Sequence, residues 1–134
     1  MLRYMFIFIG VLFSGYSLAN EDCDYGLPLG NIAACYEKKS EESDALLNDI
    51  YQKLKNTVMK SAYEESAKNI YWSTFVKSQR NWIEMRDHQC FAKGAFSEEN
   101  TPFQGIEIHK CLYYSTQDRI IYLEKEINFI QNLP

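Results

Sequence analysis

The sequence predicts an all-α fold, an up-down-up bundle of three long helices stapled by two disulfides. Apolar residues recur at spacings of three and four along three segments, as they do on the buried face of a helix. No segment shows the sustained alternation of apolar and polar residues that is typical of a strand. The chain also contains four cysteines, an even number that fits two bridges in a protein of 134 residues.

The first predicted helix begins near Ile32, and its pattern pauses around residues 60–66. Its apolar stripe weakens across residues 39–43, where the helix is either washed by solvent or interrupted. We expect the opposite face to be solvated, because Lys and Glu residues dominate it. The predicted core stripe consists of Cys35, Tyr36, Leu46, Leu47, Ile50, Tyr51, Leu54 and Val58.

The second predicted helix spans about residues 65–93 and contains no Gly or Pro before Gly94, a residue typical of helix ends. Residues 94–105 are rich in breakers and acids and predict a loop. The third helix fits residues 106–131. The predicted inner face of the second helix is Ile70, Tyr71, Thr74, Phe75, Ser78, Trp82, Met85 and Gln89. The predicted stripe of the third is Ile108, Leu112, Tyr113, Thr116, Ile120, Leu123, Ile127 and Ile130.

The N-terminus has the layout of a secretory signal peptide. Arg3 precedes an apolar run at residues 5–13, and Ser17 and Ala19 place small residues before a cleavage point. The run is shorter than the roughly 20 residues that a membrane span needs. We therefore predict a signal peptide at 1–19, a helical domain at 20–134, and a periplasmic or secreted location. Because Cys23 does not follow small residues at the cleavage point, we expect no lipid anchor.

The four cysteines, Cys23, Cys35, Cys90 and Cys111, are expected to be oxidised in an exported protein. Zinc binding is disfavoured because zinc sites use closely spaced pairs, whereas the nearest two cysteines here lie 12 positions apart. Three pairings are possible. We favour Cys23–Cys35 and Cys90–Cys111, since neighbours in sequence close short loops.

The net charge of the chain disfavours one class of binding partner. Without Arg3, the chain carries 13 basic and 18 acidic residues, a net charge of −5, and it has no basic run. Nucleic acid is therefore a poor partner, because binding it requires Lys and Arg gathered on one face. The acidic balance either suits a cationic protein partner, through charge complementarity, or merely keeps the protein soluble.

No constellation of catalytic residues stands out. His88 and His109 each precede a cysteine by two positions, but a Cys–His pair needs a free thiolate. Asp22, Asp24 and Gly26 only begin to match a calcium loop, whose closing Glu is missing. The sequence thus predicts no enzyme, no metal site and no cofactor.

The densest polar cluster lies on the second helix, where Gln79, Trp82, Arg86 and Cys90 are spaced by three and four and form one strip. An Arg one turn after a Trp can stack on the indole or reach a carboxylate on a neighbouring helix. We expect this strip mainly to tie helices together.

Residues 79–90 resemble the Q-x-x-W-x-x-x-R-D-x-x-C signature of the LprI-like lysozyme inhibitor family. Cys23, Cys35, the segment 44–51 and Thr116 extend the resemblance, and Ser43 departs from the Ala that often precedes the Asp. The residues assigned to the family motif are Gln79, Trp82, Arg86, Asp87, Cys90, Leu112 and Arg119. The resemblance implies a binding protein that inhibits a lysozyme or a related muramidase.

Residues 91–110 form the candidate partner-binding segment, stapled at its base by the expected Cys90–Cys111 bridge. An acidic loop with aromatic anchors could enter the cleft of a cationic lysozyme at reduced ordering cost. The alternatives are an ordinary helix connection, or an envelope interaction module or toxin-immunity protein with a different partner. The candidate contact residues are Phe96, Glu98, Glu99, Phe103 and Glu107.

Overall fold

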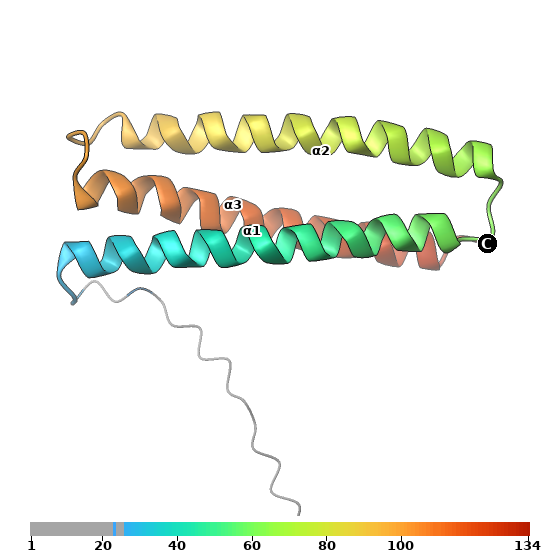
Figure 1. Ribbon diagram of the computed structural model, residues 1–134, viewed down its shortest axis with the longest axis horizontal. Coiled ribbons are helices and arrows are strands. Elements are labelled where there is room, and N and C mark those ends of the chain that lie inside the picture. The colour runs from blue at the N-terminus through green and yellow to red at the C-terminus, as the bar shows by residue number, and fades with distance from the viewer. Residues whose placement is uncertain (1–22, 24–25) are drawn as a thin grey trace, which may run out of the picture.

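A computed structural model of the chain describes Cys23 and residues 26–134. It contains three helices in up-down-up order, α1 (Leu29–Lys60), α2 (Glu65–Gly94) and α3 (Pro102–Gln131), as Figure 1 shows. The described residues include no strand, so the all-α prediction is confirmed. None of the helices in this part of the chain is long and apolar enough to cross a membrane. The predicted signal peptide, residues 1–19, lies outside the described residues.

Two helices begin earlier than their apolar stripes indicated: α1 begins directly after a proline and without a side-chain cap, whereas α3 begins at a capping threonine. Pro28 precedes α1, and its carbonyl accepts hydrogen bonds from the backbone N–H of Asn31 (2.9 Å) and Ile32 (3.2 Å). At α3, the hydroxyl of Thr101 accepts from the backbone N–H of Gln104 at 3.3 Å, and a proline occupies the first turn. The connection between α2 and α3 is therefore residues 95–101, shorter than the predicted loop.

Replacement of Thr101 by alanine should lower the free energy of unfolding by about 1 kcal/mol, the usual cost of losing an N-cap oxygen. Urea denaturation measures this difference. Thr57 provides a control, because its exposed hydroxyl donates only to a carbonyl within α1, so Thr57→Ala should be close to neutral. Equal stability of the Thr101→Ala variant and the wild type would contradict the capping role.

The predicted weak point in α1 is continuous helix, and small polar residues explain the faded stripe. Ser40 and Ser43 are buried there, and their hydroxyls donate to the carbonyls of Glu37 (2.7 Å) and Lys39 (2.8 Å). The Ser43 hydroxyl also accepts from Gln117 Nε2 of α3 at 3.0 Å. Because these groups are bonded, they can be buried where α1 meets α3.

The core runs between α1 and α3, which pack side by side along their length (Figure 1). Leu54 and Leu123 are completely buried in it. The main cluster is Leu47, Leu54, Val58, Phe75, Ile120, Leu123, Ile127 and Ile130. A smaller cluster at the other end of the bundle is Cys23, Ile32, Tyr36 and Ile106. The predicted stripe of α3 is buried or half-buried throughout, but Leu46 of the predicted α1 stripe is exposed.

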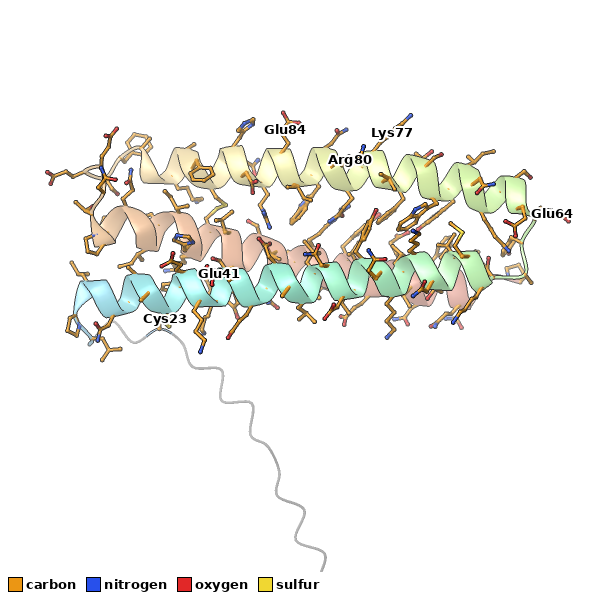
Figure 2. All side chains as sticks on the ribbon, in the orientation of Figure 1. Cys23, Glu41, Glu64, Lys77, Arg80 and Glu84 are labelled. Atoms are coloured by element: carbon orange, nitrogen blue, oxygen red, sulfur yellow. A yellow bond between two sulfur atoms is a disulfide. The ribbon has the colours of Figure 1, made fainter. Side chains whose placement is uncertain are left out.

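The predicted inner face of α2 was wrong for five of its residues. Ile70, Thr74, Ser78, Met85 and Gln89 are exposed; Ile70 retains 69% of its accessible surface. The buried residues of α2 are Lys68, Phe75, Gln79, Arg86, Cys90 and Gly94. The prediction followed apolar residues, whereas much of the true inner face is polar. α2 also lies farther from α1 and α3 than these two lie from each other, and long side chains fill the space (Figure 2).

Aromatic side chains occupy much of the space between α2 and the other two helices. Tyr71 and Trp72 each pack against Phe75, with ring centres 5.8 and 5.9 Å apart, and Tyr51 of α1 lies 5.0 Å from Trp72. The Tyr71 hydroxyl donates to Glu126 Oε2 of α3 at 2.9 Å. Burial first, and the hydrogen bond and negative charge of Glu126 second, raise the pKa of Tyr71. These contacts join α2 to both other helices.

Stability should therefore fall at alkaline pH. Unfolded tyrosine ionises near pH 10, while folded Tyr71 holds its proton to a higher pH. The stabilisation is complete below pH 10 and is lost as the pH rises toward the folded pKa, because only the unfolded chain releases the proton easily. Melting temperatures measured from pH 8 to 11 should decline above pH 10, and less steeply in Tyr71→Phe. An identical decline in both proteins would contradict this assignment.

Candidate functional site

Several of the residues that carry the family resemblance meet between the three helices, around Arg86 and Arg119. The Arg86 side chain is 8% exposed. Its Nη1 donates to Asp44 Oδ1 of α1 and, at 2.8 Å, to Thr116 Oγ1 of α3. Its Nε donates to the neighbouring Asp87 Oδ1 at 2.9 Å. One guanidinium group therefore joins α1, α2 and α3, and Asp44 is the partner carboxylate that sequence spacing alone could not identify.

A second guanidinium, that of Arg119, lies one turn along α3 from Thr116. Its Nε donates to Gln79 Oε1 at 2.9 Å, and its Cζ lies 4.6 Å from the ring centre of Tyr122. Arg86 and Arg119 both lie close to the Trp82 ring, at 5.2 and 5.3 Å from its centre. Burial lowers the pKa of Arg119, yet an arginine keeps its charge at neutral pH. The aromatic faces thus supply much of the environment of this cation.

These contacts join the three helices, and most of the side chains that make them are buried or half-buried. Gln79, Arg86 and Cys90 are buried, and Trp82 and Leu112 are half-buried. The predicted strip on α2 therefore faces inward, as expected for a set of interhelical contacts.

The histidines do not form a nucleophilic pair with the cysteines. His109 Nδ1 lies 3.1 Å from Ser40 Oγ of α1, and His88 is exposed on α2. All four cysteines are in disulfides, so neither histidine has a thiolate to activate. The described residues contain no group of His, Cys, Asp or Glu side chains that could hold a metal ion.

The disulfides pair as predicted, Cys23 with Cys35 and Cys90 with Cys111. Both lie toward one end of the bundle, where α1 and α3 begin and α2 ends; Figure 2 labels Cys23 there. We call this end, residues 26–37 and 91–111 together with Cys23, the disulfide end. The opposite end of the bundle is held by noncovalent contacts.

The connection at the disulfide end, residues 95–101, has a well-bonded backbone. Gln104 Oε1 accepts from the backbone N–H of Asn100 at 3.0 Å, and its Nε2 donates to the Gly94 carbonyl at 3.3 Å. The Thr101 hydroxyl donates to the Glu98 carbonyl at 2.7 Å. Asn100 adopts a left-handed φ of 59°, which asparagine tolerates better than most residues. The connection is therefore a defined turn rather than a slack linker.

The candidate contact residues are displayed on this turn and beside it. Phe96 is 98% exposed and Phe103 is 53% exposed, while Glu98 and Glu99 are also exposed and Glu107 is half-buried. Phe96, Phe103 and Glu107 line one shallow hollow between α2 and α3, but Glu98 and Glu99 are not part of its lining. The structure thus groups three of the five residues in one hollow and leaves the two adjacent glutamates on the loop.

These features define a class of protein: a three-helix, two-disulfide domain whose helices are joined by a buried arginine and whose stapled end displays apolar and acidic side chains. Comparison with known proteins gives the family. A family model described as lysozyme inhibitor LprI matches residues 29–123, and the chain belongs to this family. The resemblance noted in the sequence is therefore confirmed. Searches of curated proteins and of solved structures gave no match.

Proposed function

We propose that the protein is a periplasmic or secreted binding protein that inhibits a lysozyme or a related muramidase. The observation that carries the proposal is the family match, which covers residues 29–123 and most of all three helices. Oxidised cysteines fit an extracytoplasmic location, because the cytosol keeps thiols reduced. Export by a signal peptide at residues 1–19, leaving a domain at 20–134, belongs to the same proposal.

The turn at residues 95–101 supports binding by a rigid surface. Its backbone is held by Gln104 and Thr101, and the Cys90–Cys111 bridge fixes the two helices that flank it. A surface that is already ordered loses less conformational entropy on association. Exposed aromatic side chains such as Phe96 supply the large apolar contacts that commonly dominate binding energy.

The charge of this segment favours a cationic partner. The candidate segment, residues 91–110, contains Glu98, Glu99 and Glu107 against Lys93 and Lys110, and the 95–101 turn itself contains only the two adjacent glutamates as charged residues. Complementary charge accelerates encounter and orients the partners. We therefore assign Phe96, Glu98, Glu99, Phe103 and Glu107 as contact residues for a cationic muramidase. The proposal requires no catalytic residue, metal ion or cofactor in this protein.

The test is an inhibition assay. Protein recovered from the periplasm after expression of the full chain is added to several lysozymes acting on cell-wall substrate. We expect inhibition that depends on protein concentration and that weakens about tenfold in Glu98→Lys/Glu99→Lys, since the reversed charges repel a cationic partner. The matched control is Glu41→Lys/Glu84→Lys, which makes the same change of charge at exposed positions of α1 and α2 (Figure 2).

Unchanged lysis by every muramidase at micromolar concentrations of protein would overturn the proposal. A pull-down from periplasm then identifies the partner. If the pull-down recovers a protein other than a muramidase, and that complex survives about 0.3 M salt, the result would instead support an envelope interaction module or toxin-immunity protein. Salt at this concentration screens weak electrostatic attraction between surfaces.

A further inference from the structure

We propose that the partner-binding surface extends beyond the 95–101 turn to the start of α1, so that Leu27 and Leu29 form one docking surface with Phe91, Phe96 and Phe103. This inference rests on the proposed function and specifies where the cationic protein partner binds. Leu27 and Leu29 both precede Ile32, where the sequence predicted the first helix to begin, so helical periodicity gave no reason to single them out.

The five side chains are all exposed and all belong to the disulfide end. Leu27 and Leu29 retain 46% and 52% of their accessible surface, and Phe91 retains 59%. Single exposed apolar residues are ordinary on a protein surface, but several at one end are typical of an interaction site. Here they come from three separate segments: the start of α1, the end of α2 and the start of α3.

Packing brings the start of α1 against the start of α3. The two helices run in the same direction and begin at the same end of the bundle (Figure 1). Ile32 and Ile106 belong to one buried cluster, and a Cβ built on Gly105 would lie 3.9 Å from Ala33 Cβ. Leu29 and Phe103 each precede that cluster by one turn, so they occupy equivalent positions at the starts of two adjoining helices.

The disulfides hold both parts of this surface. Cys23–Cys35 ties the segment before α1 to the helix, and Cys90–Cys111 ties α2 to α3 beside the turn. Cys23 and Cys90 are themselves buried at 3% and 0% exposure. Two covalent clamps at one end restrict the motion of segments that have little core of their own. Such restriction favours binding because less entropy is lost when the partner docks.

The charge of the surface indicates a cationic protein as its occupant. The disulfide end contains four carboxylates, Glu37, Glu98, Glu99 and Glu107, and two lysines, Lys93 and Lys110, so acidic residues outnumber basic ones. An anionic membrane surface attracts Lys and Arg, so a surface with this composition is unsuited to it. A basic protein with an apolar contact region could bury the exposed leucines and phenylalanines, and its positive charges would complement the surrounding carboxylates.

The experiment compares Leu27→Ser/Leu29→Ser with the wild type, both recovered from the periplasm, for inhibition of the muramidase that the wild type inhibits. We expect inhibition about tenfold weaker, as for loss of an apolar anchor at a protein interface. Thermal unfolding should be unchanged because both leucines are exposed. The matched control is Ile70→Ser/Ile121→Ser, which removes comparably exposed side chains elsewhere and should leave inhibition unchanged. Phe91→Ser serves as a second, independent variant of the surface.

The outcomes separate the two proposals. If the wild type inhibits while both surface variants match it, the extended surface is wrong and the proposed function stands. If the surface variants change self-association in analytical ultracentrifugation but not inhibition, the surface joins copies of this chain, and the inference is overturned. If the wild type inhibits no muramidase, the proposed function fails and the inference fails with it.

Discussion

Replacement of Arg86 by alanine should lower the free energy of unfolding by about 3 kcal/mol. The guanidinium of Arg86 donates hydrogen bonds to side chains of all three helices, Asp44, Asp87 and Thr116. It also lies 5.2 Å from the Trp82 ring centre. The alanine variant loses these bonds together with the aliphatic packing of the side chain.

The size of the effect follows from the exposure of the partners. Removal of one member of a fully buried ion pair costs roughly 3–5 kcal/mol, because the other charge is left buried. Here Asp44 and Asp87 retain 51% and 39% of their side-chain surface, so water can solvate them after the arginine is lost. Thr116 is 1% exposed and loses its bond without that compensation. We therefore expect the lower part of the range.

Urea denaturation of Arg86→Ala, Arg86→Met and Arg80→Ala measures this prediction. Arg86→Met retains the apolar part of the side chain, so its difference from Arg86→Ala separates lost packing from lost hydrogen bonds. Arg80 is exposed on the same helix, and Arg80→Ala should change stability by less than about 0.5 kcal/mol. If Arg86→Ala is as stable as Arg80→Ala, the interhelical network contributes little to the fold.

The same network explains why α2 was the element least predictable from sequence. In α1 and α3 the buried residues are mostly apolar, so residues such as Leu54 and Leu123 were found from their spacing. In α2, Lys68 is buried because its Nζ donates to the Met59 carbonyl (3.2 Å) and Glu65 Oε1 (2.9 Å). Gln79 is buried beside Arg119. Met59 lies on α1 and Arg119 on α3, and local periodicity does not reveal such partners on other helices.

In the candidate site, too, some features were predictable from the sequence and others were not. The disulfide pairing followed from loop length, and the exposure of Phe96, Glu98 and Glu99 followed from their place in a loop. The role of Gln104 in ordering the turn did not follow, because its bonds depend on the conformation of Asn100. The proposed grouping of Leu29 with Phe103 depends on how α1 packs against α3, which no short segment encodes.

Removal of the Cys90–Cys111 bridge, by Cys90→Ala/Cys111→Ala, should also lower the free energy of unfolding by about 3 kcal/mol. The bridge closes a loop with a sequence separation of 21, and its loss restores conformational freedom to the unfolded chain. Alanine is preferred to serine because Cys90 is completely buried, and a hydroxyl there would be costly to bury. Urea denaturation measures the global effect.

Loss of the bridge should lower stability most in the residues near it, in addition to lowering the free energy of unfolding of the whole domain. This local effect distinguishes a bridge that holds the turn in place from one that acts only through overall stability. α2 is joined to α3 by the bridge, to both partner helices by Arg86, and farther along by the aromatic cluster around Phe75. Without the bridge, amide exchange should accelerate in residues 87–101, while the amides of the main core around Leu54 stay protected. The control, Cys23→Ala/Cys35→Ala, removes the other bridge and should leave exchange in α2 unchanged. Equal acceleration along the whole of α2 in both variants would show that the bridges act only through overall stability, and that neither holds the turn in place.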